Sequence, residues 1–110
     1  MTTLQVARFH LAGQASAFGN RVTGKKIRHT IETLLAAAPG DVLEVDFSGV
    51  ELMASSFADE VFGKLAVSLG FIGFSSRVRF IALNKFCQQI IDDVVQSRIV
   101  QSRSGNGNAK

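Results

Sequence analysis

Along most of the chain, apolar and polar residues either alternate or recur every three to four positions, so the sequence predicts both strands and helices. The alternation from Leu4 to His10 predicts a first strand. A short apolar run at residues 42–47, bounded by Pro39-Gly40 and Ser48-Gly49, predicts a second strand that is largely buried. Residues 77–83 alternate again and predict a third strand.

Three helices are predicted from stripes of apolar residues. The first begins at a Thr23 N-cap and runs to about Ala38, because the following proline cannot continue it. The second starts at Ser55 or Ser56, whose hydroxyls can cap its first turn. The third begins after an Asn84 cap. Its inward stripe is formed by Phe86, Ile90, Ile91, Val94 and Val95.

Two segments show neither the alternation of a strand nor the three-to-four-residue spacing of a helix. Residues Ala12 to Asn20 are rich in glycine, alanine and serine, and they form either a loop or an irregular strand. Residues Gly70 to Ser76 are predicted to be a loop that carries three large apolar side chains, Phe71, Ile72 and Phe74. These side chains would be exposed unless they cover the core or meet a partner.

The order of the elements predicts an α/β sandwich, because right-handed crossovers between strands place the connecting helices against the sheet. With 110 residues, the chain is long enough for one domain and too short for two. We expect this domain to span residues 1–98. Residues 99–110 end without an apolar anchor and predict a flexible tail, and the basic residues of its terminal segment, Arg103 and Lys110, are expected to be solvated.

Composition narrows the class of protein further. Cys87 is the only cysteine, so an internal disulfide is excluded, and we expect Cys87 to pack as a small apolar residue. The N-terminus lacks the order of a signal peptide, and no apolar run approaches the roughly 18 residues of a membrane span. We therefore expect a soluble cytoplasmic protein with no membrane contact.

The most specific pattern is the segment DFSGVELMASSFADEVF at residues 46–62. It predicts the end of a strand, a loop, two serines and the start of a helix. Asp59 and Glu60 follow in the first turn of that helix, where the helix dipole favours negative charge. A hydroxyl held between a strand and a helix start is suited to contact with phosphate or with a protein.

DFSGV, the serine pair and FADEVFGKL together resemble the STAS-like domains, which are relatives of the bacterial anti-sigma factor antagonists and of the cytoplasmic domains of sulphate transporters. The resemblance covers roughly residues 20–98. It implies a STAS-like sandwich with a four- or five-stranded mixed sheet and helices packed mainly on one face.

In the antagonists, an Asp-Ser-Ser/Thr-Gly motif follows the strand, and a partner kinase of the histidine-kinase-like ATPase fold phosphorylates its first hydroxyl residue. By this resemblance Ser55 is the candidate phosphoacceptor and Ser56 is the second hydroxyl residue. Ala54 stands at the Asp position of the motif, and Phe57 stands at the Gly position. The serine pair is either a phosphorylated switch or only a helix cap.

The resemblance implies a regulatory protein-binding module of the anti-sigma factor antagonist type, working by partner switching in signalling, and not an enzyme. The expected partner is a regulator with a kinase or ATPase fold. Its expected contact surface is the loop and the exposed face of the next helix: Ser48, Gly49, Ala54, Ser55, Ser56, Phe57, Asp59, Glu60, Phe62 and Lys64.

A basic cluster on the first predicted helix offers an alternative function in a chain of net charge +3, namely an adaptor that binds phosphate or nucleic acid. Arg21, Lys25 and Arg28 are its candidate anion-binding residues, with Lys26 and His29 beside them. A solvated helix face explains the same pattern. Since Phe18 is the only aromatic residue near the cluster, the pattern does not favour nucleic acid.

Motifs for catalysis are missing from the sequence, which has no phosphate loop, no metal-ligand spacing and no nucleophile triad. We therefore expect no catalytic residues, no metal and no cofactor. A purely structural subunit that forms a homodimer through Phe71 to Phe74 is a further alternative.

Overall fold

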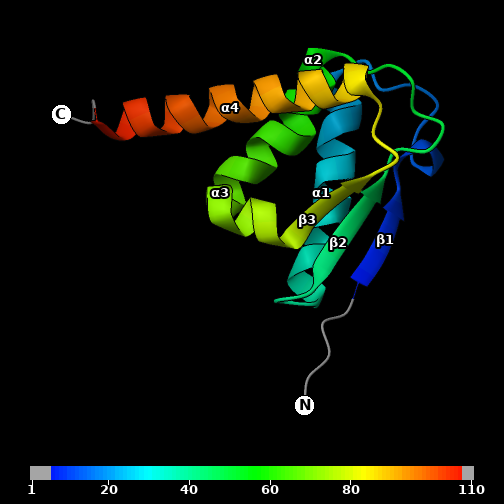
Figure 1. Cartoon of the computed structure of the whole chain (residues 1–110), viewed down its shortest axis with the longest axis horizontal. Helices are drawn as coiled ribbons and strands as arrows, with labels where there is room; N and C mark the ends of the chain where they lie inside the picture. Colours follow the sequence, from blue (N-terminus) through cyan, green and yellow to red (C-terminus); the bar gives the residue numbers. More distant parts are fainter. Residues whose placement is uncertain (1–5, 108–110) are drawn as a thin grey trace.

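The computed structural model describes residues 6–107, with side chains placed as far as residue 102, and it has an α/β architecture (Figure 1). The elements in chain order are β1 (Val6–His10), the 3-10 turn η1 (Leu11–Gly13), α1 (Arg21–Ala37), β2 (Val42–Asp46), α2 (Ser55–Ala58), the π-helical turn η2 (Asp59–Gly63), α3 (Lys64–Arg77), β3 (Val78–Ile81) and α4 (Lys85–Gly107). The predicted strand and helix order is therefore confirmed over these residues.

The sheet has three strands in the order β1-β2-β3, and all of them are parallel. A mixed sheet of four or five strands is therefore not found in the described part of the chain. Ala12 to Asn20, one candidate for an additional strand, forms the η1 turn and irregular backbone instead. Each strand is joined to the next through helices, as parallel strands require.

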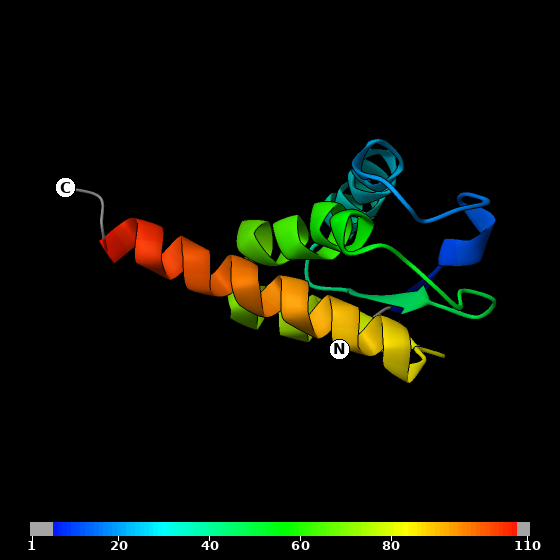
Figure 2. The same ribbon diagram turned by 90° about the horizontal axis from the view of Figure 1, so that it is seen from above.

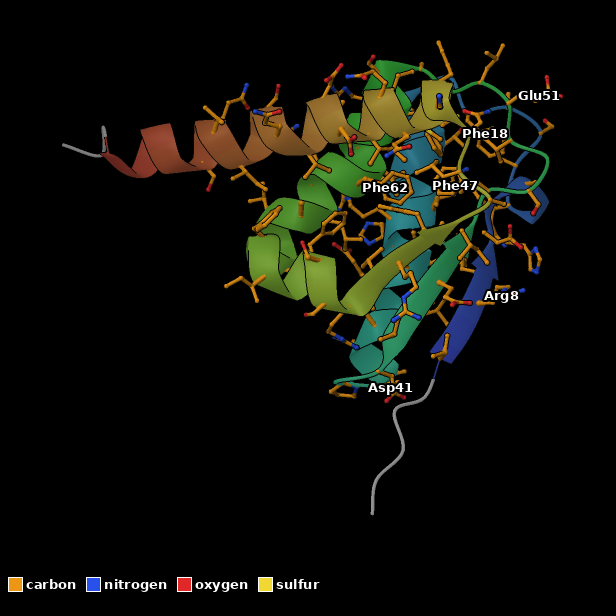
Figure 3. The ribbon with its side chains drawn as sticks, viewed as in Figure 1. Arg8, Phe18, Asp41, Phe47, Glu51 and Phe62 are labelled. Atoms are coloured by element: carbon orange, nitrogen blue, oxygen red, sulfur yellow. The ribbon has the colours of Figure 1, made fainter. Side chains whose placement is uncertain are left out.

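One face of the sheet packs against the helices, as the sandwich prediction states. Register places Phe9, Val45 and Phe80 side by side on this inner face. Phe47 and Phe62 fill the space between sheet and helices (Figure 3), and the Phe80 ring lies 5.7 and 5.3 Å from their ring centroids. Edge-on aromatic contacts of this kind add to the free energy of apolar burial.

Helix α2, the turn η2 and the first part of α3, as far as Gly70, form one continuous helical rod. The predicted loop at Gly70 to Ser76 is wrong, because helix α3 resumes after a single break at Gly70 and continues to Arg77. Gly70 has a φ of 77° and a ψ of 159°, a conformation that glycine adopts without steric cost. Phe74 is buried in the core by this second half of α3, whereas Phe71 and Ile72 remain exposed.

Helix α1 ends before Pro39-Gly40 as predicted, and side chains satisfy backbone groups at both of its ends. Its N-cap is Asn20, not Thr23, because the Asn20 side chain accepts a hydrogen bond from the Thr23 backbone N–H at 2.9 Å. At its other end, Arg77 donates to the backbone oxygens of Leu35 and Ala38 at 2.9 and 2.7 Å. The same guanidinium donates to the oxygen of Asp41 at 3.1 Å, so Arg77 joins α3 to the α1–β2 connection.

Helix α4 runs along the outside of the α2–η2–α3 rod, and that rod separates it from α1 (Figure 2). The predicted Asn84 cap is confirmed, since Asn84 Oδ1 accepts from the Cys87 N–H at 2.8 Å. Residues 99–107, which the sequence assigns to a tail, continue this helix, and residues 108–110 lie outside the described part. No helix within residues 6–107 carries an apolar stretch long enough to cross a bilayer.

Candidate functional site

The candidate site is the loop between β2 and α2, and its backbone is fixed where it leaves the sheet. Asp46 Oδ1 accepts hydrogen bonds from the Ser48 backbone N–H at 2.9 Å and from the Ser48 hydroxyl at 2.7 Å. These two donors, the hydroxyl first, hold the pKa of Asp46 below its usual value. Gly49 follows with a φ of 83°, which favours glycine, and Val50 N–H closes the turn on the Phe47 oxygen at 2.9 Å.

The far half of the loop is held by two neighbouring segments. Ala54 N–H donates to the Phe18 backbone oxygen at 2.9 Å. The Asn84 side chain, which caps α4 through its oxygen, donates through its nitrogen to the Glu51 backbone oxygen at 3.1 Å. The loop is therefore a fixed surface whose position depends on the α4 cap.

Side chains of the loop alternate between core and solvent. Val50 and Met53 are buried, whereas Glu51 and Leu52 point outward, and Leu52 is 69% exposed. A shallow groove of about 450 Å³ beside Leu52 is lined by Phe18, Gly49 and Met53 among others. An exposed leucine on a rigid loop beside a groove is the kind of feature that protein interfaces use.

Ser55 and Ser56 are the first two residues of helix α2. The predicted caps are wrong, because Ala54 occupies the N-cap position and the first turn of α2 has no side-chain cap. Ser55 is exposed and Ser56 is half-buried. Both line a polar pocket of about 480 Å³ together with Arg21, Asp59 and Arg98, so α1, α2, η2 and α4 all meet beside the serines.

Asp59 binds two arginines from different helices. Arg98 of α4 donates from Nε and Nη2 at 2.7 and 2.6 Å, and Arg21 of α1 donates from Nη1 at 2.8 Å. These charge-assisted bonds, with Arg98 contributing most, hold the pKa of Asp59 below its usual value. Arg98 lies seven residues after the buried Ile91, a spacing that places it on the inward side of α4.

Glu60 is the more deeply buried of the two acids, at 4% exposure. Arg28 Nη2 and Lys64 Nζ lie 3.1 and 3.0 Å from its carboxylate, and Arg21 Nη1 lies 3.3 Å away. Burial by itself would raise the pKa of Glu60, but the three cations outweigh it and lower the pKa. Gly24 allows this close packing, since a Cβ there would lie 3.0 Å from the Glu60 Cβ.

The predicted recognition surface is partly incorrect, because three of its residues are not accessible. Phe57 and Phe62 belong to the core, and Glu60 is enclosed by its cations. Helical spacing of the apolar residues already predicts that Phe57 and Phe62 face inward. The burial of Glu60 could not be predicted in this way, since η2 packs between α1 and α4 and is buried on most sides. Ser48, Gly49 and Ser55 are exposed, and Ala54, Ser56, Asp59 and Lys64 are partly exposed.

The predicted basic cluster is divided between two environments. Arg21 and Arg28 face η2 and pair with Asp59 and Glu60, so they serve the fold. Lys25 and Lys26 are exposed. In the anion site predicted at Arg21, Lys25 and Arg28, both arginines are therefore already paired with carboxylates.

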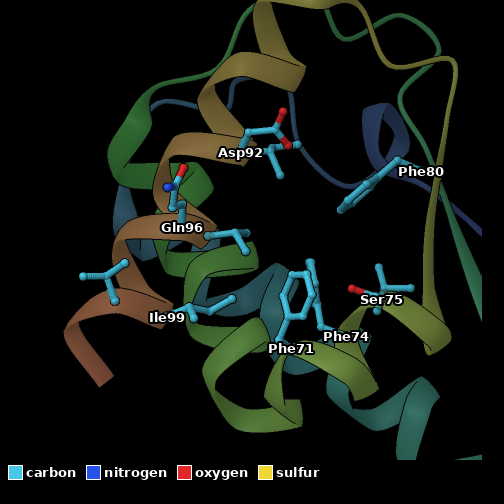
Figure 4. Close-up of a pocket in the computed structure, with 11 residues that line it drawn as sticks. Phe71, Phe74, Ser75, Phe80, Asp92, Gln96 and Ile99 are labelled. Carbon is cyan, nitrogen blue, oxygen red and sulfur yellow. The ribbon is translucent and has the colours of Figure 1, made fainter. Parts of the chain in front are cut away.

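A second surface feature is an apolar groove of about 690 Å³ between α3, β3 and α4 (Figure 4). Phe71, Phe74 and Ser75 of α3 lie along one side, and Gln96 and Ile99 of α4 lie along the other. Cys87 is not at either surface. It is fully buried, and burial raises its thiol pKa, as expected for a packing residue.

Within residues 6–107, no group of three or more His, Cys, Asp or Glu side chains is arranged to hold a metal ion. The fold and the site thus define an α/β domain whose distinguishing feature is an anchored loop and serine pair at a helix start. A family model described as a STAS-like domain of unknown function (DUF4325) matches residues 23–86, which is more than half of the chain. The chain therefore belongs to this family of STAS-like domains, and the predicted resemblance is confirmed. No match was found among curated proteins or among solved structures.

Proposed function

We propose that the protein is a non-enzymatic regulatory module that binds a protein partner through the loop from Ser48 to Ser56. The single observation that supports this function most is the exposure of Leu52 on a loop held by Asp46, Phe18 and Asn84. A preformed loop loses little conformational entropy on binding, so an exposed apolar side chain on it can contribute fully to affinity.

Phosphorylation of Ser55 or Ser56 is the proposed switch. A phosphate on either serine would bring about −1.5 to −2 charges into the pocket that also contains Arg21 and Arg98. Both arginines donate to Asp59, so the phosphate would compete with this carboxylate for the same guanidinium groups. The modification would then alter the contact of α4 with η2 as well as the charge beside the loop.

The proposed partner has a kinase or ATPase fold, by resemblance to the partners of anti-sigma factor antagonists. The chain departs from the motif of those antagonists at Ala54 and Phe57. Phe57 is fully buried, so it does not obstruct access to Ser55, which is exposed.

The proposal is tested by purifying the protein from its native cell with whatever binds to it, and weighing it intact. We expect a phosphate-sized mass increase that maps to Ser55 or Ser56 in part of the material. The recovered partner should bind unmodified protein and lose affinity for Ser55→Asp and for Leu52→Asp. A partner that binds all three forms equally would contradict the assignment to this loop.

Lys26→Asp is the matched control, because it places the same acid at an exposed position of α1 outside the loop. Its affinity for the partner should stay within about twofold of wild type, as expected for a site outside the interface. A loss of binding in Lys26→Asp as large as that in Leu52→Asp would assign the contact to the basic face of α1.

A further inference from the structure

The outer face of the sheet carries a row of charges across all three strands. Register aligns Arg8 of β1, Glu44 of β2 and Arg79 of β3. Arg8 Nη2 donates to Glu44 Oε1 at 3.0 Å, whereas Arg79 Nη1 lies 3.6 Å from Glu44 Oε2, too far for a hydrogen bond. The Glu44 carboxylate is therefore shared by two guanidinium groups, and most of their N–H groups do not donate to it.

Among residues 6–107, no helix packs against this face. The helices pack on the side of Phe9, Val45 and Phe80, and β1 and β2 are seen without anything in front of them in Figure 1. Parallel sheets almost always have both faces covered, whereas sheets with one face in water are usually antiparallel. Over residues 6–107 this face is therefore unusual in having no helix on it, and its exposed arginines are available to a partner although Val42 and Asp46 of β2 are buried.

The accessible charge on the outer face is positive. The side chains of Arg8 and Arg79 are 54% and 56% exposed. The acids beneath them, Glu44 and Asp46, have side chains that are only 15% and 6% exposed. An approaching molecule meets the guanidinium groups first.

We infer that the outer face of the sheet is a second docking surface, and that it binds an acidic segment of a partner protein. Strands lie about 4.8 Å apart, so Arg8 and Arg79 stand roughly 10 Å apart across the face. Carboxylates spaced along an extended or helical acidic segment can reach both arginines, and each can accept two parallel hydrogen bonds. This inference does not depend on the proposed role of the Ser48–Ser56 loop.

Other occupants fit less well. A second copy placed face to face would set arginine rows near arginine rows, and like charges oppose that contact. Nucleic acid would place phosphates over Glu44 and Asp46, and the outer-face positions of the three strands, Val6, Arg8, His10, Val42, Glu44, Asp46, Arg79 and Ile81, include no Phe, Tyr or Trp on which bases could stack.

The test uses the full chain and a hexaglutamate peptide as the probe, followed by amide NMR shifts at low salt. We expect the peptide to shift the amides of residues 7–9, 43–45 and 78–80. The double variant Arg8→Gln with Arg79→Gln should bind about tenfold more weakly, a loss that corresponds to two exposed charge-assisted contacts. Glu44→Gln should bind more tightly, because it frees both arginines from their carboxylate.

Lys25→Gln with Lys26→Gln is the matched control, since it removes the same charge from the exposed face of α1. It should bind hexaglutamate within about twofold of wild type. The inference is overturned if the shifts map to α1, if both double variants weaken binding equally, or if no shift occurs. It is also overturned if a thymidine hexanucleotide shifts the same sheet amides at lower concentration than the peptide does.

Discussion

Arg98 on α4 donates two hydrogen bonds to Asp59 in η2, at 2.7 and 2.6 Å. This pair is the polar link between the last helix and the rod that begins with the serine pair. Because Asp59 also accepts from Arg21, the three residues join α1, η2 and α4 around one carboxylate. The candidate switch residues and the position of α4 are therefore physically connected.

Removing this link should destabilise the protein and loosen α4. We expect Arg98→Ala to lower the free energy of unfolding by about 2 kcal/mol, because hydrogen bonds to a charged group are lost and Asp59 keeps only one cation. Arg98→Lys should recover only part of the loss, since an ammonium cannot form the two parallel bonds. Urea denaturation measures both changes.

Lys26→Ala is the control for this series, because Lys26 is exposed on α1. Its midpoint of unfolding should match that of wild type. Hydrogen exchange should also quicken in α4 of Arg98→Ala before it does so in the sheet. A variant that loses protection uniformly, or not at all, would show that the pair does not hold α4.

Glu60 and Asp59 should make stability depend on pH at the acid end. Both have a folded-state pKa below their ordinary values of 4.5 and 3.8. Their contribution is therefore fully present above the unfolded-state values and is lost as the pH falls below about 4.5 toward the folded-state values. We expect a fall in the free energy of unfolding in this window and little change from these groups between pH 6 and 8.

Glu60→Gln should remove much of this dependence and cost about 2 to 3 kcal/mol at neutral pH, since three cations lose their partner. Glu51→Gln is the matched control, because Glu51 is an exposed residue of the loop. Thermal unfolding across pH 3 to 7 compares the two. An unchanged acid transition in Glu60→Gln would mean that other carboxylates dominate it.

Arg77 should be a stabilising residue with no role in binding. Arg77→Ala leaves the oxygens of Leu35, Ala38 and Asp41 without their guanidinium donor and should cost about 2 kcal/mol. Arg79→Ala, two positions later on the exposed face, should change stability little. Equal unfolding midpoints for the two variants in urea would contradict this role for Arg77.

A substitution in the apolar groove between α3, β3 and α4 tests whether the protein forms a homodimer. Phe71 lines this groove and is 61% exposed, so Phe71→Asp should change the unfolding midpoint little. If the groove joins two copies, sizing with light scattering should show a dimer for wild type and a monomer for this variant. A monomer in both cases, with partner binding intact, would leave the loop as the main interface.

The strands, the order of elements and the Asn84 cap could be predicted because they depend on local patterns. Strand β2 is a buried apolar run between turn residues, and Asn84 has the side chain that helix starts favour. The sequence did not show that the helix breaks at Gly70 and then resumes, and a loop was predicted to start there instead. Glycine and serine around it favour turns, and only the burial of Phe74 explains why the helix resumes.

Which residues of the candidate site are exposed could be predicted only in part. Phe62 and Glu60 are buried because η2 lies between two helices, an arrangement that depends on tertiary contacts. The pairing of Arg21 with Asp59 and of Arg28 with Glu60 was not predicted, because these partners lie more than 30 positions away in the chain. Local spacing cannot identify pairs at that separation.

The most direct test of the proposed function is site-specific cross-linking in the native cell. A photo-reactive amino acid replaces Leu52 in one strain and Val22, which is equally exposed on α1, in another. We expect one major cross-linked protein at position 52, of kinase or ATPase fold, with little product at position 22 and a reduced yield when Ser55→Asp is added. Cross-links at position 22 but none at position 52 would contradict the claim that the loop binds the partner.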